Sequence, residues 1–268
     1  MVGRLGPPRR VAASCTVGLL ALGAAAFIAC GDGATREPPE PAVLVDAVTY
    51  EAGEQAKISQ QSGAPDGLAV TDETTRAGDA AGVAVLRPGD QQFRGTIGYR
   101  SEWQSDFQAV PGTEYWYGVS LYLPDDWDQG SNANFFDDRI VFQFHEGTGS
   151  SPAMSLHVRE DDGRLVLRRR TEDGFEYPWS TPFETERWYD FAFHVRWSQE
   201  DDGFVQLFVD GELIGEYQGR TLVDGRIIYT KWGIYGQPTR ILVDEVRIAE
   251  GRAGGLALVS PDQLVSPR

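Results

Sequence analysis

Cysteine is almost absent from this 268-residue sequence, which contains only Cys15 and Cys30. Both lie among the first thirty residues, so the rest of the chain has no thiol for a disulfide, a metal cluster or a catalytic nucleophile. Burial of apolar side chains must therefore stabilise the fold. Hydrophobic residues make up 41% of the chain, which is enough for the core of an ordinary globular protein.

Positive charge is also scarce, since the formal net charge is −16 at pH 7 and the only lysines are Lys57 and Lys231. So acidic a chain would repel the phosphates of a nucleic acid, which argues against such a partner. It would also repel an acidic glycan at long range. A site for such a polymer must therefore concentrate positive charge locally.

The N-terminal segment has the pattern of an export signal. Arg4, Arg9 and Arg10 precede an apolar run over residues 11–28, and the residues up to Cys30 resemble a bacterial lipobox. We expect cleavage before Cys30 and acylation of its thiol, which would attach the protein to a membrane without a spanning helix. The alternative is an uncleaved membrane helix, for which the apolar run is only marginally long enough.

This pattern divides the chain into three parts. Residues 1–29 are predicted to be a lipoprotein signal peptide, and the proline-rich residues 30–43 a lipid-anchored linker. Residues 44–268 would form one domain, a length that all-β folds often reach. We expect an exported monomer in a bacterial cell envelope, on its periplasmic or surface face, with the lipid as its only contact with the membrane.

Long stretches of helical periodicity are missing after residue 44, where short alternating runs between turn signals predict β-strands. Asp162-Gly163 and Asp210-Gly211 lie between such runs and predict hairpin turns. The pattern predicts a jelly-roll sandwich of two antiparallel sheets, with a loop at residues 125–138. The predicted strands cover residues 82–86, 98–103, 114–123, 139–145, 153–159, 164–171, 188–197, 204–209, 212–217, 227–235 and 241–248.

Three of these strands place polar side chains on one face, because residues two apart along a strand point the same way. If the strands are neighbours, these side chains line a concave groove. Gly233 also marks a place where another group must approach the strand closely. The shared faces hold Arg100 with Glu102, then Gln143 with His145, and finally Tyr229, Lys231, Gly233 and Tyr235, while Ile140, Phe142, Phe144, Trp232 and Ile234 point the other way.

The three strands resemble the signature strands of the jelly-roll polysaccharide lyases. The resemblance rests on Arg100-Ser101-Glu102, on Gln143-Phe144-His145, and on the run from Tyr229 to Gln237, and it extends over roughly residues 44–250. The group includes alginate, glucuronan and heparin-lyase-I-like lyases. The sequence around the three motifs is most similar to the heparin-lyase-I-like branch. The alginate lyase pattern is broken at Gln104 and Gly236, which argues against alginate. The resemblance implies a concanavalin-A-like fold and an acidic polysaccharide as the substrate.

The resemblance also implies a mechanism, β-elimination at a uronic acid. Arg100, Gln143 and Lys231 would neutralise the sugar carboxylate, on which charge develops in the transition state. His145 would be the base or a further neutralising group, and Tyr235 the acid, or both acid and base where proton and leaving group share a side. The residues expected to bind substrate are Glu102, Tyr229, Gly233 and Gln237.

Catalysis of this kind requires no cofactor, but a structural calcium ion is an open question. Asp244 resembles a calcium-binding position in some sandwich domains, and residues 125–138 are rich in oxygen ligands. The remaining histidines, His157 and His194, are expected to be structural. The run Arg168-Arg169-Arg170 places Arg168 and Arg170 on one face of a strand, which is expected to be solvated, with a glycan contact as the less favoured alternative.

Three other functions fit a sandwich of this kind. A non-catalytic glycan-binding module would tolerate loss of the base or the acid, whereas this chain keeps both His145 and Tyr235. A glycoside hydrolase needs paired carboxylates, which no predicted strand offers on one face. A surface adhesin is the third alternative. The sequence leaves open which uronate polymer is cut, and whether cleavage is internal or terminal.

Overall fold

The computed structural model describes residues 39–52, 58–95, 98–130, 139–147, 151–159 and 161–264. The predicted signal peptide, Cys30 and most of the linker lie outside the described residues, and so do residues 131–138 of the predicted loop. The assignments of these segments therefore remain predictions. In the part of the chain that is described, no helix is both long and apolar enough to cross a membrane.

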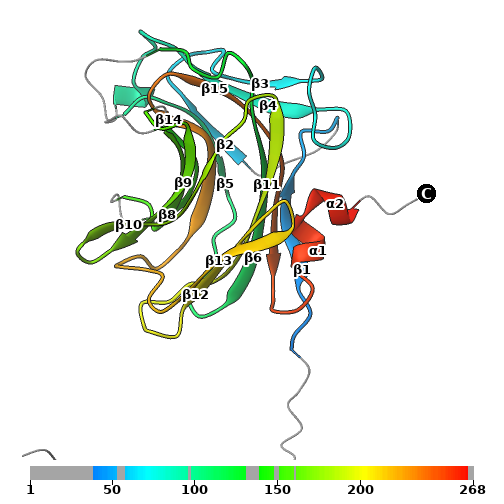
Figure 1. Ribbon diagram of the computed structural model, residues 1–268, viewed down its shortest axis with the longest axis vertical. Helices are drawn as coiled ribbons and strands as arrows, with labels where there is room; N and C mark the ends of the chain where they lie inside the picture. Colours follow the sequence, from blue (N-terminus) through cyan, green and yellow to red (C-terminus); the bar gives the residue numbers. More distant parts are fainter. Residues whose placement is uncertain are drawn as a thin grey trace, which may run out of the picture. The chain divides into compact units, whose positions relative to one another are not determined.

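Two antiparallel sheets form the domain, and Figure 1 shows them as separate layers. The first has eight strands, in the order β13-β12-β11-β6-β15-β4-β3, with β1 also paired to β15. Their bounds are β1 Val43–Val48, β3 Leu68–Thr71, β4 Ala81–Leu86, β6 Glu114–Leu123, β11 Arg187–Arg196, β12 Phe204–Val209, β13 Glu212–Gln218 and β15 Thr239–Glu250.

The second sheet has seven strands, in the order β10-β9-β8-β7-β14-β5-β2. The jelly-roll sandwich predicted from the sequence is therefore confirmed. The bounds are β2 Ile58–Ser62, β5 Arg100–Ser105, β7 Arg139–His145, β8 Met154–Arg159, β9 Arg164–Thr171, β10 Gly174–Pro182 and β14 Tyr229–Gly236.

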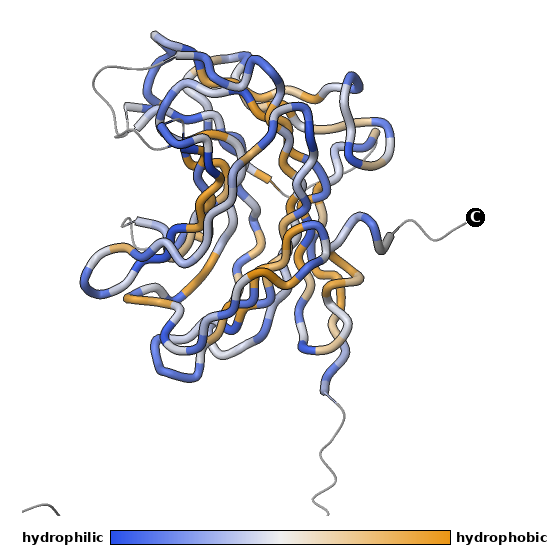
Figure 2. The backbone as a smooth tube through the Cα atoms, in the orientation of Figure 1, coloured by the Kyte–Doolittle hydropathy of each residue, from blue (hydrophilic) through white to orange (hydrophobic). Residues whose placement is uncertain are grey.

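One apolar core fills the space between the sheets, because alternate residues of the strands point inward. Trp103, Phe142, Phe193 and Trp232 are each at most 2% exposed there. Along the strands of Figure 2, apolar and polar positions alternate accordingly. The outward side of the seven-stranded sheet is therefore left to the polar side chains of its central strands.

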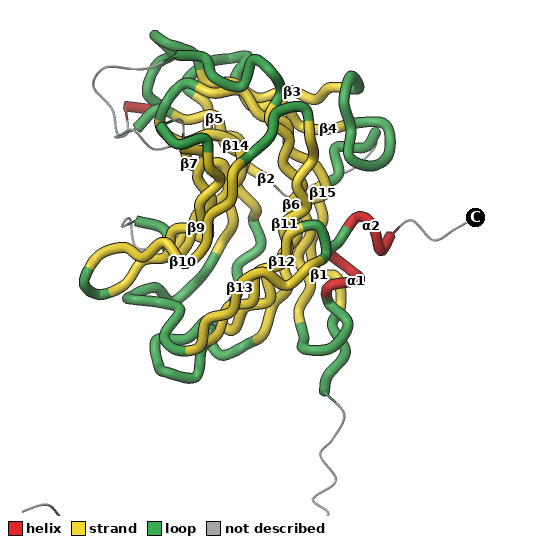
Figure 3. Tube along the Cα trace, viewed as in Figure 1, coloured by secondary structure: helices red, strands yellow, loops and turns green. Residues whose placement is uncertain are grey.

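Helices are few and short, as Figure 3 shows. α1 (Leu256–Val259) and α2 (Pro261–Leu264) follow β15, and a 3₁₀ turn, η1, covers Phe93–Gly95. Val259 of α1 packs with Trp116, Ala192 and Ala249 on the outer side of the eight-stranded sheet. These helices therefore lie away from the polar side chains of the other sheet.

The predicted strands are all present, within two residues at each end. At the β12–β13 turn, Asp210 and Gly211 both have positive φ, as a type I′ hairpin requires. The prediction missed β1, β2, β3 and β10. β10 contains Pro178 and Pro182, which an edge strand tolerates because part of its backbone is not paired.

Candidate active site

The three strands with polar side chains are neighbours, with β14 between β5 and β7. Across β14 and β5, Tyr235 lies opposite Arg100, and Lys231 opposite Gln104. Across β14 and β7, Lys231 lies opposite Gln143, and Tyr229 opposite His145. The predicted candidates therefore share one surface, which we call the polar face: the outward side of the seven-stranded sheet at β5, β14 and β7.

Gly233 lies where the backbone of β5 approaches β14 too closely for a side chain. Its φ of +119° is a conformation that other residues rarely adopt, and a Cβ atom there would lie 2.3 Å from the Ser101 carbonyl oxygen. The register between β14 and β7 also shifts at this point, as in a β-bulge. The close approach predicted for Gly233 is thus made by β5, and contact with a substrate remains a prediction.

A single buried carboxylate lies between two cations on the polar face. Glu102 is 1% exposed, and its Oε2 lies 3.7 Å from Nη1 of Arg100. Gln143 donates a hydrogen bond from Nε2 to Glu102 Oε1. Burial raises the pKa of Glu102, while Lys231 and Arg100 oppose that rise. With Glu102 ionised, two positive charges share one negative charge, which leaves the cluster one unit positive.

Gln61 of β2 joins the two cations, and the sequence prediction missed it. Its Oε1 accepts hydrogen bonds from Nη1 of Arg100 at 3.1 Å and from Nζ of Lys231 at 3.2 Å. Its Nε2 donates to Oε1 of Gln104 at 2.8 Å. Because an amide carries no net charge, Gln61 positions both cations without cancelling their charge.

At one end of the cluster, the His145 ring stacks on Tyr229, with 5.2 Å between ring centres. Burial, followed by the charges of Lys231 and Arg100, lowers the pKa of His145 to about 4. The imidazole is therefore neutral at pH 7. Its Nδ1 accepts a hydrogen bond from the Gly147 backbone N–H at 3.2 Å, which places the proton of the neutral ring on Nε2.

At the other end, Arg100 lies over the ring of Tyr235, with 4.8 Å from its Cζ to the ring centre. Burial raises the pKa of the Tyr235 phenol, and the charge of Arg100 opposes this only in part. The phenol is therefore protonated at neutral pH, which suits a proton donor. The polar face thus presents a neutral imidazole at one end, a neutral phenol at the other, and a net positive charge between them.

Ile140 corrects the predicted alternation along β7. It was expected to point inward with Phe142, but it lies opposite Tyr235 of β14 and His157 of β8, whose side chains belong to the outward side. The β7–β8 register shifts between Ile140 and Phe142, so Val141 is the extra residue of a bulge. Val141 consequently joins the core, and Ile140 does not.

The other two histidines have protein partners, in keeping with the structural roles expected of them. Nε2 of His157 lies 2.8 Å from the Ser155 hydroxyl, and the side chain is 2% exposed. His194 belongs to the other sheet, where it stacks on Trp116 with 3.9 Å between ring centres. His194 therefore lies outside the polar face.

The expectation of a solvated strand at Arg168-Arg169-Arg170 is wrong. Arg168 is only 9% exposed and Arg169 only 6%, and Arg170 pairs with Asp224 at 3.2 Å. The cause is that β10 and the residues after β13 cover these side chains, with the Phe175 ring against Arg168. Arg168 is consequently packed against β10 and largely buried, rather than part of a solvated strand.

Asp244 holds backbone amides. Its Oδ2 accepts hydrogen bonds from the N–H groups of Arg76 at 2.9 Å and Ala77 at 3.2 Å, and its Oδ1 accepts one from Glu245 at 2.7 Å. Among the described residues, no group of three or more His, Cys, Asp or Glu could hold a metal ion. Gln237 is 4% exposed just beyond the end of β14, and its contact with substrate remains a prediction.

The polysaccharide lyase family matches residues 49–247, which is well over half of the chain. The chain belongs to this family. No curated protein matches the sequence significantly. The matched range contains β5, β7 and β14, and therefore the whole of the cluster between His145 and Tyr235.

Solved structures support the fold of this lyase. An endo-β-1,4-glucuronan lyase from the fungus Trichoderma reesei superposes with a TM-score of 0.53 at 17% identity, over 78% of this chain and 92% of that one. The catalytic domain of a family 131 glycoside hydrolase from Coprinopsis cinerea gives 0.52 at 14% identity, over 74% and 84%. At such identities the similarity shows a common jelly-roll fold and does not identify the substrate.

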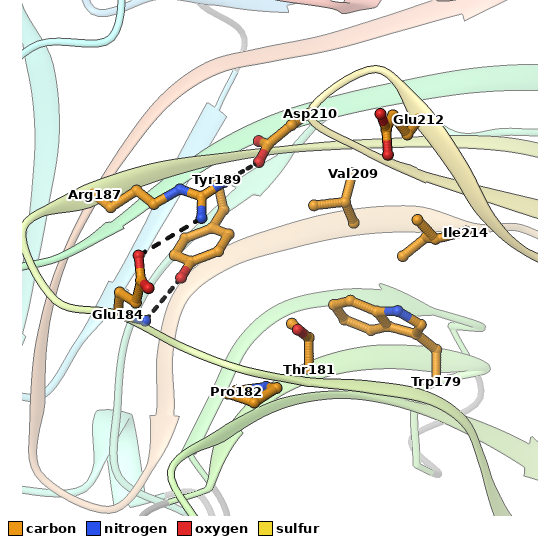
Figure 4. A pocket seen from close by; sticks show the side chains of 10 residues that line it. All are labelled: Trp179, Thr181, Pro182, Glu184, Arg187, Tyr189, Val209, Asp210, Glu212 and Ile214. Atoms are coloured by element: carbon orange, nitrogen blue, oxygen red, sulfur yellow. Dashed lines mark hydrogen bonds and ion pairs between the residues drawn. The ribbon is translucent and has the colours of Figure 1, made fainter.

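A cavity of about 600 Å³ lies elsewhere in the lyase, between β10 and the strands β11 to β13. Figure 4 shows Trp179 on one side of it, with Val209 and Ile214 across from the indole. Its rim carries the carboxylates of Glu184, Asp210 and Glu212, against the single cation Arg187. An acidic glycan would be repelled there, so the polar face is the better candidate for the active site.

Proposed function

We propose that this polysaccharide lyase cuts a uronic-acid-containing glycan by β-elimination and leaves an unsaturated uronate at the new end. One observation carries the proposal: two cations share one buried carboxylate in a chain whose net charge is −16. A local positive charge in so acidic a protein is the feature that an acidic polymer requires. The Trichoderma reesei relative, a glucuronan lyase by name, acts on a polymer of this class.

Elimination removes the proton on C5, which is weakly acidic until the neighbouring carboxylate is neutralised. Arg100 and Lys231 supply positive charge for this, and the Gln143 amide supplies hydrogen bonds. Glu102 and Gln61 hold these groups in place before the substrate arrives. Charge that develops on the sugar carboxylate in the transition state therefore meets donors that need no rearrangement.

Tyr235 is the acid that protonates the departing O4 oxygen. Its phenol is protonated at neutral pH, because burial raises its pKa from the ordinary value of 10.0. If Tyr235 instead acted as a phenolate base at pH 7, ionising it would cost at least about 4 kcal/mol, given 1.36 kcal/mol for each pH unit. That cost argues against a phenolate base.

His145 is the base that removes the C5 proton. Its imidazole is neutral at pH 7, so no energy is spent on deprotonation. To accept the proton at Nε2, the ring must carry its own proton on Nδ1, which breaks the hydrogen bond from Gly147. Losing one such bond costs about 1 kcal/mol, which is less than the cost of ionising Tyr235.

A glycoside hydrolase is the less suitable reading, although a hydrolase domain has the same fold. That chemistry needs two carboxyl groups on either side of the bond that is broken. Over β5, β7 and β14, whose residues are all described, the only carboxylate is Glu102, and both of its sides are occupied by protein groups.

The test uses purified residues 39–268 and a panel of glucuronan, alginate, heparin, heparan sulfate and pectate. We expect ultraviolet absorbance from a new C4–C5 double bond with at least one polymer. Tyr235→Phe should abolish this signal while binding is retained, whereas Tyr122→Phe, on the other sheet, should remain active. Binding without cleavage across the whole panel would instead establish a glycan-binding module.

A further inference from the structure

A row of side chains continues from the candidate active site toward the edge of the sheet. Lys231 lies opposite Gln143, Gln143 opposite Ser155, and Ser155 opposite Arg168, across the strands β14, β7, β8 and β9. Residues directly opposite one another in a sheet point to the same side. Arg168 therefore shares the side of Lys231, three strand spacings of about 4.8 Å away, or about 14 Å.

Aromatic residues of β10, the strand that pairs with β9, lie beside the end of this row. The Cζ atom of Arg168 lies 4.4 Å from the centre of the Phe175 ring. Phe175 is 44% exposed and Tyr177 is 59% exposed, both unusually open for aromatic residues. A cation beside open ring faces can pair with a carboxylate while the rings pack against the C–H groups of a sugar.

The charge of Arg168 also acts on the proposed catalytic acid, Tyr235. This charge acts on the phenol in the same direction as that of Arg100, lowering a pKa that burial raises. Arg100 and Arg168 therefore place positive charge on one side of the sheet, at β5 and at β9. Two cations on separate strands can bind two charged groups of an extended anion.

We propose that Arg168, Phe175 and Tyr177 form a second binding subsite, which holds an acidic sugar residue of the substrate at a distance from the bond that is cleaved. The backbones of β14 and β9 lie about 14 Å apart, so a polymer that contacts both Lys231 and Arg168 lies across the strands, from β14 toward β10. The subsite contributes binding energy only to chains long enough to reach it. The inference rests on the proposed function, because it assumes an acidic glycan on the polar face.

The experiment measures equilibrium binding of size-graded glucuronate oligosaccharides to a Tyr235→Phe protein, which does not consume them. We expect affinity to rise sharply at the length that first reaches Arg168. Adding Arg168→Gln should weaken binding of longer oligosaccharides about tenfold, the worth of one charge-assisted hydrogen bond, and leave that of shorter ones unchanged. Phe175→Ala should show the same dependence on length.

The matched control is Arg196→Gln, which removes an equal charge on the other sheet and should have no effect. Thermal unfolding first establishes that the Arg168→Lys and Arg168→Gln variants are both folded. Because Arg168→Lys keeps the charge, it should bind the longer oligosaccharides more tightly than Arg168→Gln does. Equal weakening at every length, or none at any length, would overturn the subsite alone. Failure of the Tyr235→Phe parent to bind any acidic polymer, repeated with alginate and pectate, would overturn the proposed function as well.

Discussion

Replacing Gln61 by glutamate tests whether the net positive charge of the cluster drives catalysis. The Gln61 Oε1 atom accepts hydrogen bonds from both Arg100 and Lys231, at 3.1 and 3.2 Å. A carboxylate of nearly the same size can keep these contacts and add one negative charge. The cluster then has two cations and two acids, so nothing remains to attract the carboxylate of the substrate.

The expected loss follows from Coulomb's law. A substrate carboxylate that pairs with the same two cations would lie roughly 6 Å from the new one, which at an effective dielectric constant of about 20 costs about 3 kcal/mol. That corresponds to a fall of roughly 100-fold in kcat/KM, measured on the polymer that the wild-type enzyme degrades best.

Two variants separate charge from packing. Gln60→Glu adds the same charge one residue earlier, at an exposed side chain that points to the other side of the sheet. Its kcat/KM should remain close to that of the wild type. Gln61→Leu removes the hydrogen bonds without adding charge, and should lose only about tenfold. The reasoning is refuted if Gln61→Glu is no worse than Gln61→Leu, or if Gln60→Glu is equally damaging.

Two further predictions concern acidity and stability. The pKa of His145, the base, is about 4, and Tyr235, the acid, is protonated at neutral pH. The value of kcat/KM should therefore be level from about pH 5 to 9, fall at lower pH as the imidazole gains a proton, and fall at higher pH as the phenol loses one. A tenfold rise per pH unit between 7 and 10 would instead identify Tyr235 as the base. Asp244→Ala leaves three backbone N–H groups without their acceptor, so it should cost about 3 kcal/mol and lower the unfolding midpoint by roughly 10 °C. A calcium chelator should leave the wild-type midpoint unchanged, whereas a clear drop would support the calcium hypothesis for Asp244.

The main strands could be predicted because their alternation is visible in the sequence. In β14, Thr230, Trp232 and Ile234 are at most 1% exposed, between the polar positions of the candidate site. That contrast identifies both the strand and the side that carries chemistry. The order of the strands, with β14 between β5 and β7, was not predicted, since local periodicity contains no information about neighbours.

Gln61 could not be found in this way. β2 reads Ile-Ser-Gln-Gln-Ser, with one apolar residue and no alternation, because an edge strand needs little burial. Only the β2–β5 pairing brings Gln61 beside Arg100 and within reach of Lys231. The residue that positions both cations is therefore a consequence of tertiary structure.

Bulges and edge contacts account for the remaining errors. In Ile140-Val141-Phe142 every residue is apolar, so the sequence gives no sign that Val141 is the extra residue and that Ile140 faces outward. Arg168 was assigned to a solvated strand because three arginines in succession resemble one. Its partner Phe175 comes from β10, a strand that was not predicted because it contains two prolines.

An acidic protein can bind an acidic substrate because the repulsion between their charges and the attraction to the cluster act over different distances. At physiological ionic strength the charges of the whole surface are screened beyond about 8 Å, so most of the repulsion is lost before contact. Buried charges are screened much less, and Lys231 is only 5% exposed. Repulsion by the surface therefore weakens with salt faster than attraction by the cluster, and the sparse cations suffice because they are buried around one carboxylate, Glu102.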